Sequence, residues 1–165
     1  MSKKVFVGMS GGVDSSVAAA LLVEQGYDVT GVYMKNWSED LPGMHCPWAE
    51  DVADAKRVAV GLGIDFRVFD FQKEYKQNVV DYMIREYQAG RTPNPDIMCN
   101  QEVKFKIFLE ASLAAGADYI ATGHYARVAH ESSSLAKLLR ARDDNKDQTY
   151  FLYRVTSEAL LKTIL

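Results

Sequence analysis

The chain has 165 residues, of which 48% are hydrophobic and 25% are charged, with a formal net charge of −3. This balance suits one globular domain with a sizeable core, and it excludes a disordered, collagen-like or disulfide-stapled chain and any global basic excess for nucleic acid. Two cysteines and no apolar run near the ~20 residues of a membrane span predict a cytoplasmic protein with no membrane segment.

Short apolar runs alternate along the chain with segments of helical periodicity. The pattern predicts strands over 5–9, 29–34, 66–71 and 119–122. Helices are predicted over 14–25 after the first strand, 49–62 after the second, and 74–89 and 101–115 between the third and the fourth. This order indicates a three-layer α/β sandwich with a mostly parallel sheet. In such sheets, ligands bind at the carboxyl ends of the strands.

The pattern changes after residue 122. Two short strands over 125–129 and 135–141 are predicted to form a hairpin with its turn at 131–134, and residues 150–165 are predicted to be helical. The last helix reaches Leu165 with no cap and no polar tail. We therefore expect residues 1–165 to form one domain, truncated from a longer protein.

The loop Gly8–Ser16 joins the first strand to the first helix. Its two adjacent glycines let the backbone approach a ligand, and the N–H groups of the helix start attract phosphate. The hydroxyls of Ser10, Ser15 and Ser16 are expected to add donors. The loop has neither the lysine of a Walker A motif nor the G-x-G-x-x-G pattern. Asp14 beside a phosphate implies Mg²⁺ between them, although an ordinary helix start would also explain these residues.

The string Ser-Gly-Gly-Val-Asp-Ser in this loop resembles the signature of pyrophosphatase-loop (PP-loop) ATP enzymes, which release pyrophosphate and include GMP synthetase. The resemblance implies an adenine-nucleotide-hydrolase-like fold. It also implies that ATP adenylates a poorly reactive oxygen so that this oxygen can leave.

A second loop, residues 90–100, separates two predicted helices and contains Cys99. Asn100 is expected to cap the helix that begins near Gln101, which places Cys99 just outside a helix N-terminus. That position, with Lys104 and Lys106 beyond it, favours a thiolate, and Asp96 could serve as acid or base. A buried structural cysteine is an equally good interpretation of this loop.

Three further strings narrow the resemblance. Pro-Asn-Pro-Asp followed by Cys-Asn (93–100), Gly-His-Tyr-Ala-Arg (123–127) and Lys-Asp-Gln (146–148) resemble segments of the bacterial tRNA 2-thiouridylases, or tRNA-uridine 2-sulfurtransferases. The similarity is collinear over essentially the whole chain. The implied activity is 2-thiolation of the wobble uridine of tRNA, with ATP, Mg²⁺, tRNA and a persulfide sulfur-donor relay protein as cofactors and partners.

The resemblance assigns roles residue by residue. The implied ATP-binding residues are Gly8, Met9, Ser10, Gly11, Gly12, Val13, Asp14, Ser15, Met34 and Gly123, with Asp14 also toward Mg²⁺. The implied contacts to tRNA and its target base are Asn94, Pro95, Asp96, His124, Lys146, Asp147 and Gln148. Cys99, with Asp96, matches the catalytic position. From the residues alone, Met34 is better interpreted as a core residue.

In the family a second cysteine carries the persulfide and forms a disulfide with the first. That cysteine and the central and C-terminal tRNA-binding domains are absent from this chain, and Cys46 does not match the position. The acidic residues 39, 40, 50, 51 and 54 are interpreted as a solvated helix start. Two alternatives stay open: a PP-loop adenylating ligase or amidotransferase resembling GMP synthetase, and a non-catalytic module that senses ATP or AMP.

Overall fold

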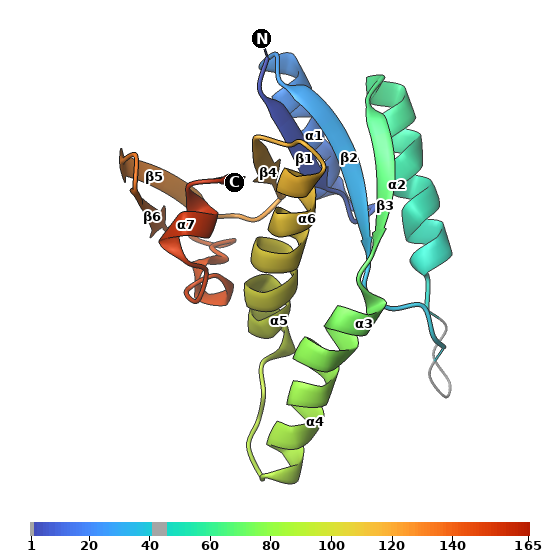
Figure 1. Cartoon of the computed structure of the whole chain (residues 1–165), viewed down its shortest axis with the longest axis vertical. Coiled ribbons are helices and arrows are strands. Elements are labelled where there is room, and N and C mark those ends of the chain that lie inside the picture. Colours follow the sequence, from blue (N-terminus) through green and yellow to red (C-terminus); the bar gives the residue numbers. More distant parts are fainter. Residues whose placement is uncertain (1, 41–45) are drawn as a thin grey trace.

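The computed structural model describes residues 2–40 and 46–165. Five strands form one sheet in the order β3-β2-β1-β4-β7, and every neighbouring pair runs parallel (Figure 1). Their bounds are β1 Lys4–Gly8, β2 Asp28–Lys35, β3 Asp65–Asp70, β4 Tyr119–Ala121 and β7 Thr163–Ile164. The predicted parallel α/β sheet is therefore confirmed.

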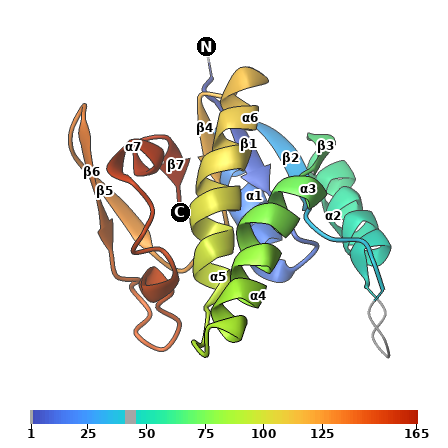
Figure 2. The same ribbon diagram turned by 60° about the horizontal axis from the view of Figure 1, so that its bottom comes forward.

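Helices cover both faces of this sheet. One layer consists of α1 (Val13–Glu24) and α2 (Trp48–Leu62). The other contains two longer helices, each with a π-helical section; the first comprises α3 (Gln72–Tyr75), η1 (Lys76–Val80) and α4 (Asp81–Gln88), and the second comprises α5 (Pro95–Met98), η2 (Cys99–Ile107) and α6 (Phe108–Ala114). Figure 2 shows these two longer helices side by side in front of the sheet.

Alternation along β1 divides the core into two halves. Val5 and Val7 are fully buried in the cluster that includes Ala19 and Ala59, from α1 and α2. Phe6 points to the opposite face, into the cluster on the side of η2 and α6. This is the two-residue period of a strand buried on both faces, as parallel sheets require.

The first four predicted strands and the first two predicted helices are confirmed, with bounds shifted by no more than one residue. The predicted helix over 74–89 is also present, but it begins at Gln72.

The predicted start of the helix over 101–115 is wrong. This helix begins at Pro95, and the Asn94 side chain caps it by accepting from the Asp96 and Ile97 amides at 3.1 and 3.2 Å. Proline is tolerated at the first helical position because its missing N–H has no helical partner there. The two prolines therefore mark a helix start, where the sequence analysis placed a loop.

The predicted helix over 150–165 is also wrong. This segment contains a 3-10 turn η3 (Thr149–Phe151), a short helix α7 (Ser157–Leu160) and strand β7. The backbone beyond α7 pairs with the sheet edge, where the Ile120 amide donates to Lys162 O at 2.9 Å. Long-range pairing to β4 overrides the local helical pattern, because that edge otherwise leaves its polar groups unpaired.

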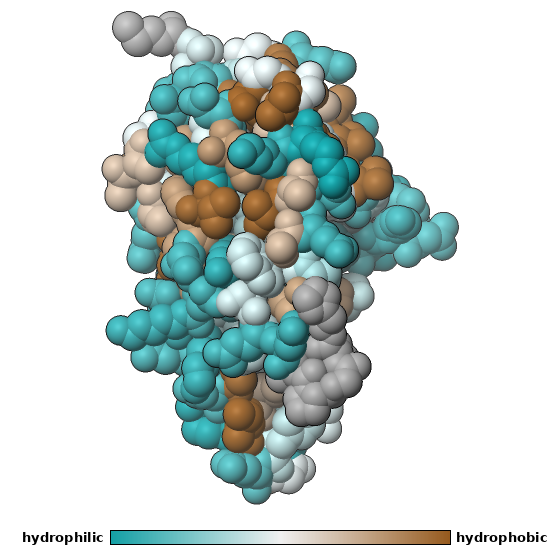
Figure 3. Space-filling model, turned by 90° about the vertical axis from the view of Figure 1, so that its right-hand side faces the viewer, coloured by the Kyte–Doolittle hydropathy of each residue, from teal (hydrophilic) through white to brown (hydrophobic). Residues whose placement is uncertain are grey.

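The predicted hairpin is confirmed as β5 (Arg127–Ser132) and β6 (Leu135–Leu139), an antiparallel pair apart from the main sheet. Ser157 of α7 holds the hairpin against α7, because the Ser157 hydroxyl donates to the Ala136 carbonyl oxygen in β6 at 3.1 Å. On the opposite side of the molecule, over β3 and α2, hydrophobic surface residues such as Val60 and Val68 are interspersed with hydrophilic ones (Figure 3). None of the helices in the described part of the chain combines the length and apolar character needed to cross a bilayer.

Candidate functional site

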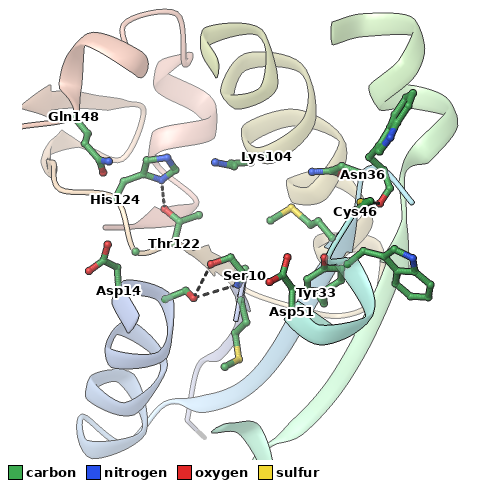
Figure 4. Close-up of a pocket in the computed structure, with 17 residues that line it drawn as sticks. Ser10, Asp14, Tyr33, Asn36, Cys46, Asp51, Lys104, Thr122, His124 and Gln148 are labelled. Carbon is green, nitrogen blue, oxygen red and sulfur yellow. Dashed lines mark hydrogen bonds between the residues drawn. The ribbon is translucent and has the colours of Figure 1, made fainter. Parts of the chain in front are cut away.

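A cleft of about 500 Å³ opens at the carboxyl ends of β1, β2 and β4, where the strand order predicted ligand binding (Figure 4). It is lined by Gly8, Met9, Ser10, Asp14, Ser15, Tyr33, Met34, Asn36, Trp37, Cys46, Trp48, Asp51, Lys104, Thr122, Gly123, His124 and Gln148. One wall is the Gly8–Ser16 loop, and η2 contributes Lys104 from the opposite side.

Hydroxyl groups hold the Gly8–Ser16 loop in shape. The Ser15 and Ser16 hydroxyls donate to Gly12 O at 3.2 and 2.8 Å, and the Ser10 amide donates to the Ser15 hydroxyl at 3.2 Å. Ser15 is buried and its hydroxyl shapes the loop, although the residue also lines the cleft, where the sequence analysis expected it to face a ligand. The first-turn amides of α1, beside the cleft, have no partner within the helix and present the positive end of its dipole.

Two glycines let neighbouring backbones approach this loop. Gly11 has φ of +84°, and a Cβ there would lie 2.7 Å from the Asp51 carbonyl oxygen at the start of α2. A Cβ on Gly123 would lie 2.7 Å from both Asp14 C and Ser15 N. Gly123 was expected to admit a ligand, and in the structure it also admits the first turn of α1. The β4 end, the loop and α2 are thereby locked together.

Asp14 links the loop to the segment after β4. The Tyr125 hydroxyl donates to Asp14 Oδ1 at 3.0 Å, and this contact raises the pKa of Tyr125. Two hydrogen bonds of 2.9 Å join Tyr125 to Gln148. The Tyr125 backbone N–H donates to Gln148 Oε1, and the Gln148 backbone N–H donates to the Tyr125 carbonyl oxygen. The predicted residues Asp14 and Gln148 therefore meet through Tyr125, a residue to which the sequence analysis gave no role.

The opposite end of the cleft is apolar and aromatic. Both tryptophans of the chain, Trp37 and Trp48, line it together with Met34, which also packs against the core cluster around Phe6. The sequence analysis assigned no function to Tyr33, Asn36, Trp37, Cys46, Trp48, Asp51 or Thr122, and all of them line the cleft. Lys104, which was expected only to favour a Cys99 thiolate, also lines it. Asn36 and Trp37 lie just after the second strand, and Trp48 and Asp51 lie at the start of the second helix, so the strand-end rule could have indicated these four.

His124 lies in the cleft as a neutral group. Its Nδ1 is 2.8 Å from the Thr122 hydroxyl, and its ring packs against Phe105 with centroids 5.6 Å apart. Burial, with a smaller effect from the Lys104 charge, lowers the pKa of His124 to about 3. This side chain therefore offers hydrogen bonds at neutral pH and carries no positive charge.

Cys99 does not have the environment that the sequence predicted. It is the first residue of η2, inside the helix that Asn94 caps, and it packs half-buried against the core that includes Phe105. Burial raises the pKa of its thiol, the Asp96 carboxylate raises it further, and the Lys104 charge lowers it. The predicted thiolate is therefore wrong for this state, because burial outweighs the lysine.

Asn100 is likewise not a helix cap. It is buried within the helix, and its amide donates to Phe151 O at 3.3 Å. It ties η2 to η3, far along the sequence.

The predicted tRNA residues do not all line the cleft. His124 and Gln148 line it, whereas Asn94, Pro95 and Asp96 lie at the start of the Cys99 helix, beyond the cleft's lining. Asp147 accepts from the Ala141 amide at 2.9 Å and from the Thr149 hydroxyl at 2.7 Å, and these bonds lower its pKa. Asp147 therefore organises its own loop. Exposed Lys146 lies over the Tyr125 ring, 5.4 Å from its centroid.

Three predicted residues of the Gly8–Ser16 loop, Gly11, Gly12 and Val13, do not line the cleft, and Val13 is exposed to solvent. Within residues 2–40 and 46–165, no three His, Cys, Asp or Glu side chains gather into a metal-binding group. Cys46 and Cys99 are both free thiols, so the structure gives no support to the expected disulfide.

A family model described as the tRNA methyl transferase HUP domain matches residues 3–165. The chain is 57% identical over 160 residues to the tRNA-specific 2-thiouridylase MnmA of Thiobacillus denitrificans, covering 97% of this chain and 45% of that protein. It is 55% identical over 164 residues to the protein of the same name from Methylobacillus flagellatus, covering 99% and 45%. The chain thus spans less than half of the length of these relatives.

Among solved structures, one similar chain is a predicted subunit of tRNA methyltransferase from Methanocaldococcus jannaschii. The TM-score is 0.50 at 23% identity, over 73% of this chain and 53% of that one. At this identity the similarity supports the α/β fold alone.

Proposed function

Because this chain belongs to the tRNA methyl transferase HUP domain family, we propose that it is the ATP-binding part of an enzyme that replaces the C2 oxygen of the tRNA wobble uridine with sulfur. The high identity to relatives named tRNA-specific 2-thiouridylase supports the reaction. Residues 1–165 form its adenylating domain, and the further domains that hold tRNA belong to the rest of a longer protein.

The observation that carries the proposal is the cleft at the strand ends. It joins the N-terminus of α1 and the Gly8–Ser16 loop at one end to Met34, Trp37 and Trp48 at the other. Helix-start amides suit phosphate, and flat aromatic and thioether side chains suit a purine ring. A volume of about 500 Å³ falls within the range typical of small-molecule sites. ATP has the matching polarity from end to end.

The carboxylates in the cleft fit Mg²⁺ that arrives with the nucleotide. Asp14 and Asp51 both line the cleft, and two carboxylates do not make a complete cage. Mg²⁺ is commonly bound by one or two carboxylates plus substrate phosphates. We assign Asp14 to the metal, with Tyr125 holding one of its oxygens.

The chemistry has two stages. The uridine O2 attacks the α-phosphorus of ATP, a P–O bond forms, and pyrophosphate leaves. The terminal sulfur of a persulfide on a second cysteine, supplied by a relay protein, then bonds to C2, and AMP leaves with the oxygen. The Cys99 thiolate then attacks the inner sulfur, which is the Sγ of the second cysteine. A disulfide forms between the two cysteines, and the bond between that Sγ and the sulfur on C2 breaks, which releases the thiouridine. We assign the role of proton acceptor for the Cys99 thiol to Asp96, which is exposed and whose charge acts on that thiol.

We assign the tRNA contacts to two segments. Asn94, Pro95 and Asp96 at the start of the Cys99 helix would meet the target base, which must leave its stack to reach the cleft. His124, Lys146, Asp147 and Gln148 would meet the RNA on the hairpin side. The neutral His124 imidazole suits a hydrogen bond to a base or hydroxyl rather than a charge contact with phosphate.

The first experiment measures nucleotide binding by this chain. Both tryptophans line the cleft, so their fluorescence reports on it directly. Mg-ATP should change this fluorescence, and Asp14→Ala should weaken Mg-ATP binding by about tenfold or more while leaving thermal stability nearly unchanged, because Asp14 is exposed. Equal losses of binding and stability would identify Asp14 as a structural residue of the helix start.

The second experiment uses the full-length protein with tRNA, ATP and a sulfur donor. Cys99→Ser should abolish 2-thiouridine while ATP binding persists. Thiolation that survives this change would refute the role of Cys99. An acceptor other than tRNA would favour an adenylating ligase instead.

A further inference from the structure

The Gly8–Ser16 loop contains no basic residue, although it faces the proposed phosphate site. The cleft also holds the carboxylates of Asp14 and Asp51, which repel a polyanion. His124 is neutral and cannot offset them. Among the described residues that line the cleft, Lys104 is the one lysine or arginine.

Lys104 is directed into the cleft from η2. Figure 4 shows its ammonium group on the His124 side of the cleft, across from Ser10 and the loop. Lys104 and His124 both line the cleft, and the Lys104 charge contributes to the lowered pKa of His124.

Lys104 has no carboxylate partner among the residues that the structure describes. Its neighbour Lys106 on the same helix pairs with Glu102 at 2.9 Å and faces solvent, whereas Lys104 is half-buried and forms no ion pair. A half-buried ammonium group without a counter-charge has lost part of its hydration. It therefore favours binding of an anion, because charge-assisted hydrogen bonds to the anion offset that loss.

The π-helical winding of η2 relates Lys104 to Cys99. In a π-helix the hydrogen bonds run from i to i+5, so the wider turn brings residues five apart toward the same face. In an α-helix, residues five apart diverge. The electrostatic effect of Lys104 on the Cys99 thiol is consistent with this proximity.

We propose that Lys104 is the phosphate-binding cation of the cleft, placed on the Cys99 helix instead of in the loop, where a Walker A lysine would stand. The inference rests on the proposed nucleotide site. It has a consequence for Cys99, because a phosphate that neutralises Lys104 removes its stabilisation of the thiolate. Bound nucleotide phosphate therefore keeps Cys99 less reactive, and departure of the phosphate restores its reactivity.

The test is a fluorescence titration of this chain with Mg-ATP and with adenosine, in the wild type, Lys104→Gln, Lys104→Arg and the matched control Lys106→Gln. Loss of one charged hydrogen-bond donor should weaken Mg-ATP binding roughly 10- to 100-fold in Lys104→Gln. Adenosine affinity should stay unchanged, Lys104→Arg should keep most of the ATP affinity, and Lys106→Gln should match the wild type.

Unchanged ATP affinity in Lys104→Gln, or an equal loss for ATP and adenosine, would overturn the inference. If the wild type itself bound no nucleotide, the proposed function would fail first, so the two failures are distinguishable. Lys104→Met, which keeps the aliphatic stem, provides a second neutral variant if Lys104→Gln does not fold. As an independent readout, Mg-ATP should slow Cys99 alkylation in a Cys46→Ser background, and Lys104→Gln should abolish that effect.

Discussion

Replacing Gly123 with alanine tests whether the spacing between β4 and the Gly8–Ser16 loop controls the site. The added Cβ would lie 2.7 Å from Asp14 C and Ser15 N and 3.0 Å from Asp14 O. All three are backbone atoms of the first turn of α1, so no side chain can rotate away. Ordinary contact begins at 3.4 Å, so the strand end and the helix start must separate by about 0.7 Å.

Two effects follow from that separation. Overpacking of this kind costs about 1–3 kcal/mol, which in a domain of this size lowers Tm by roughly 3–10 °C. The shift also displaces the α1 amides from the phosphate site, and displacements approaching 1 Å weaken such sites strongly. We expect Mg-ATP affinity, followed by tryptophan fluorescence, to fall by about tenfold or more.

Gly61→Ala is the matched control. Gly61 lies in α2, and nothing stands within 4 Å of the position its Cβ would take. The substitution should leave ATP affinity unchanged and raise stability by about 0.5–1 kcal/mol, because alanine restricts the unfolded chain more than glycine does. The reasoning is refuted if Gly123→Ala matches the wild type in both Tm and ATP affinity, or if it loses stability with no change in affinity.

Three further predictions concern single groups. In a Cys46→Ser background, iodoacetamide should alkylate Cys99 more slowly than a free thiol at pH 7, and Asp96→Asn should accelerate the reaction, because the Asp96 carboxylate raises the Cys99 pKa; a fast reaction at pH 7 would contradict the buried thiol. The stability that neutral His124 contributes is present above pH 6.5 and is lost as the pH falls toward about 3, because over this range the histidine takes up a proton in the unfolded chain but not in the folded one. The Tm of His124→Gln should therefore depend less on pH between 6.5 and about 3 than the Tm of the wild type. An identical pH dependence of the two Tm values would contradict the lowered pKa of His124. Tyr125→Phe removes the bond to Asp14 and should weaken Mg-ATP binding a few-fold with little change in Tm, and unchanged binding would show that Tyr125 does not position Asp14.

Local patterns in the sequence were sufficient for four of the five strands of the sheet and for half of the cleft. Apolar runs such as 5–9 and helical spacing such as 14–25 reflect burial on two faces and on one face, and such patterns predicted the first four strands and the first two helices within one residue. The glycine-rich loop at a strand end predicted one wall of the cleft, because the glycines and hydroxyls that mark such a loop are consecutive residues. The strings around residues 93–100, 123–127 and 146–148 predicted the family.

Contacts between distant segments decided the rest. Residues 163–164 pair with the edge of β4 as a strand of the sheet. The Cys99 helix begins at Pro95, so Asn94 caps it instead of Asn100. Burial among core side chains raised the Cys99 pKa, although the lysines nearby in sequence argued for a thiolate. Lys104 lines the cleft from a π-helical section, which no local propensity indicated. Desolvation and long-range pairing depend on what packs against a residue, and only the tertiary structure supplies those neighbours.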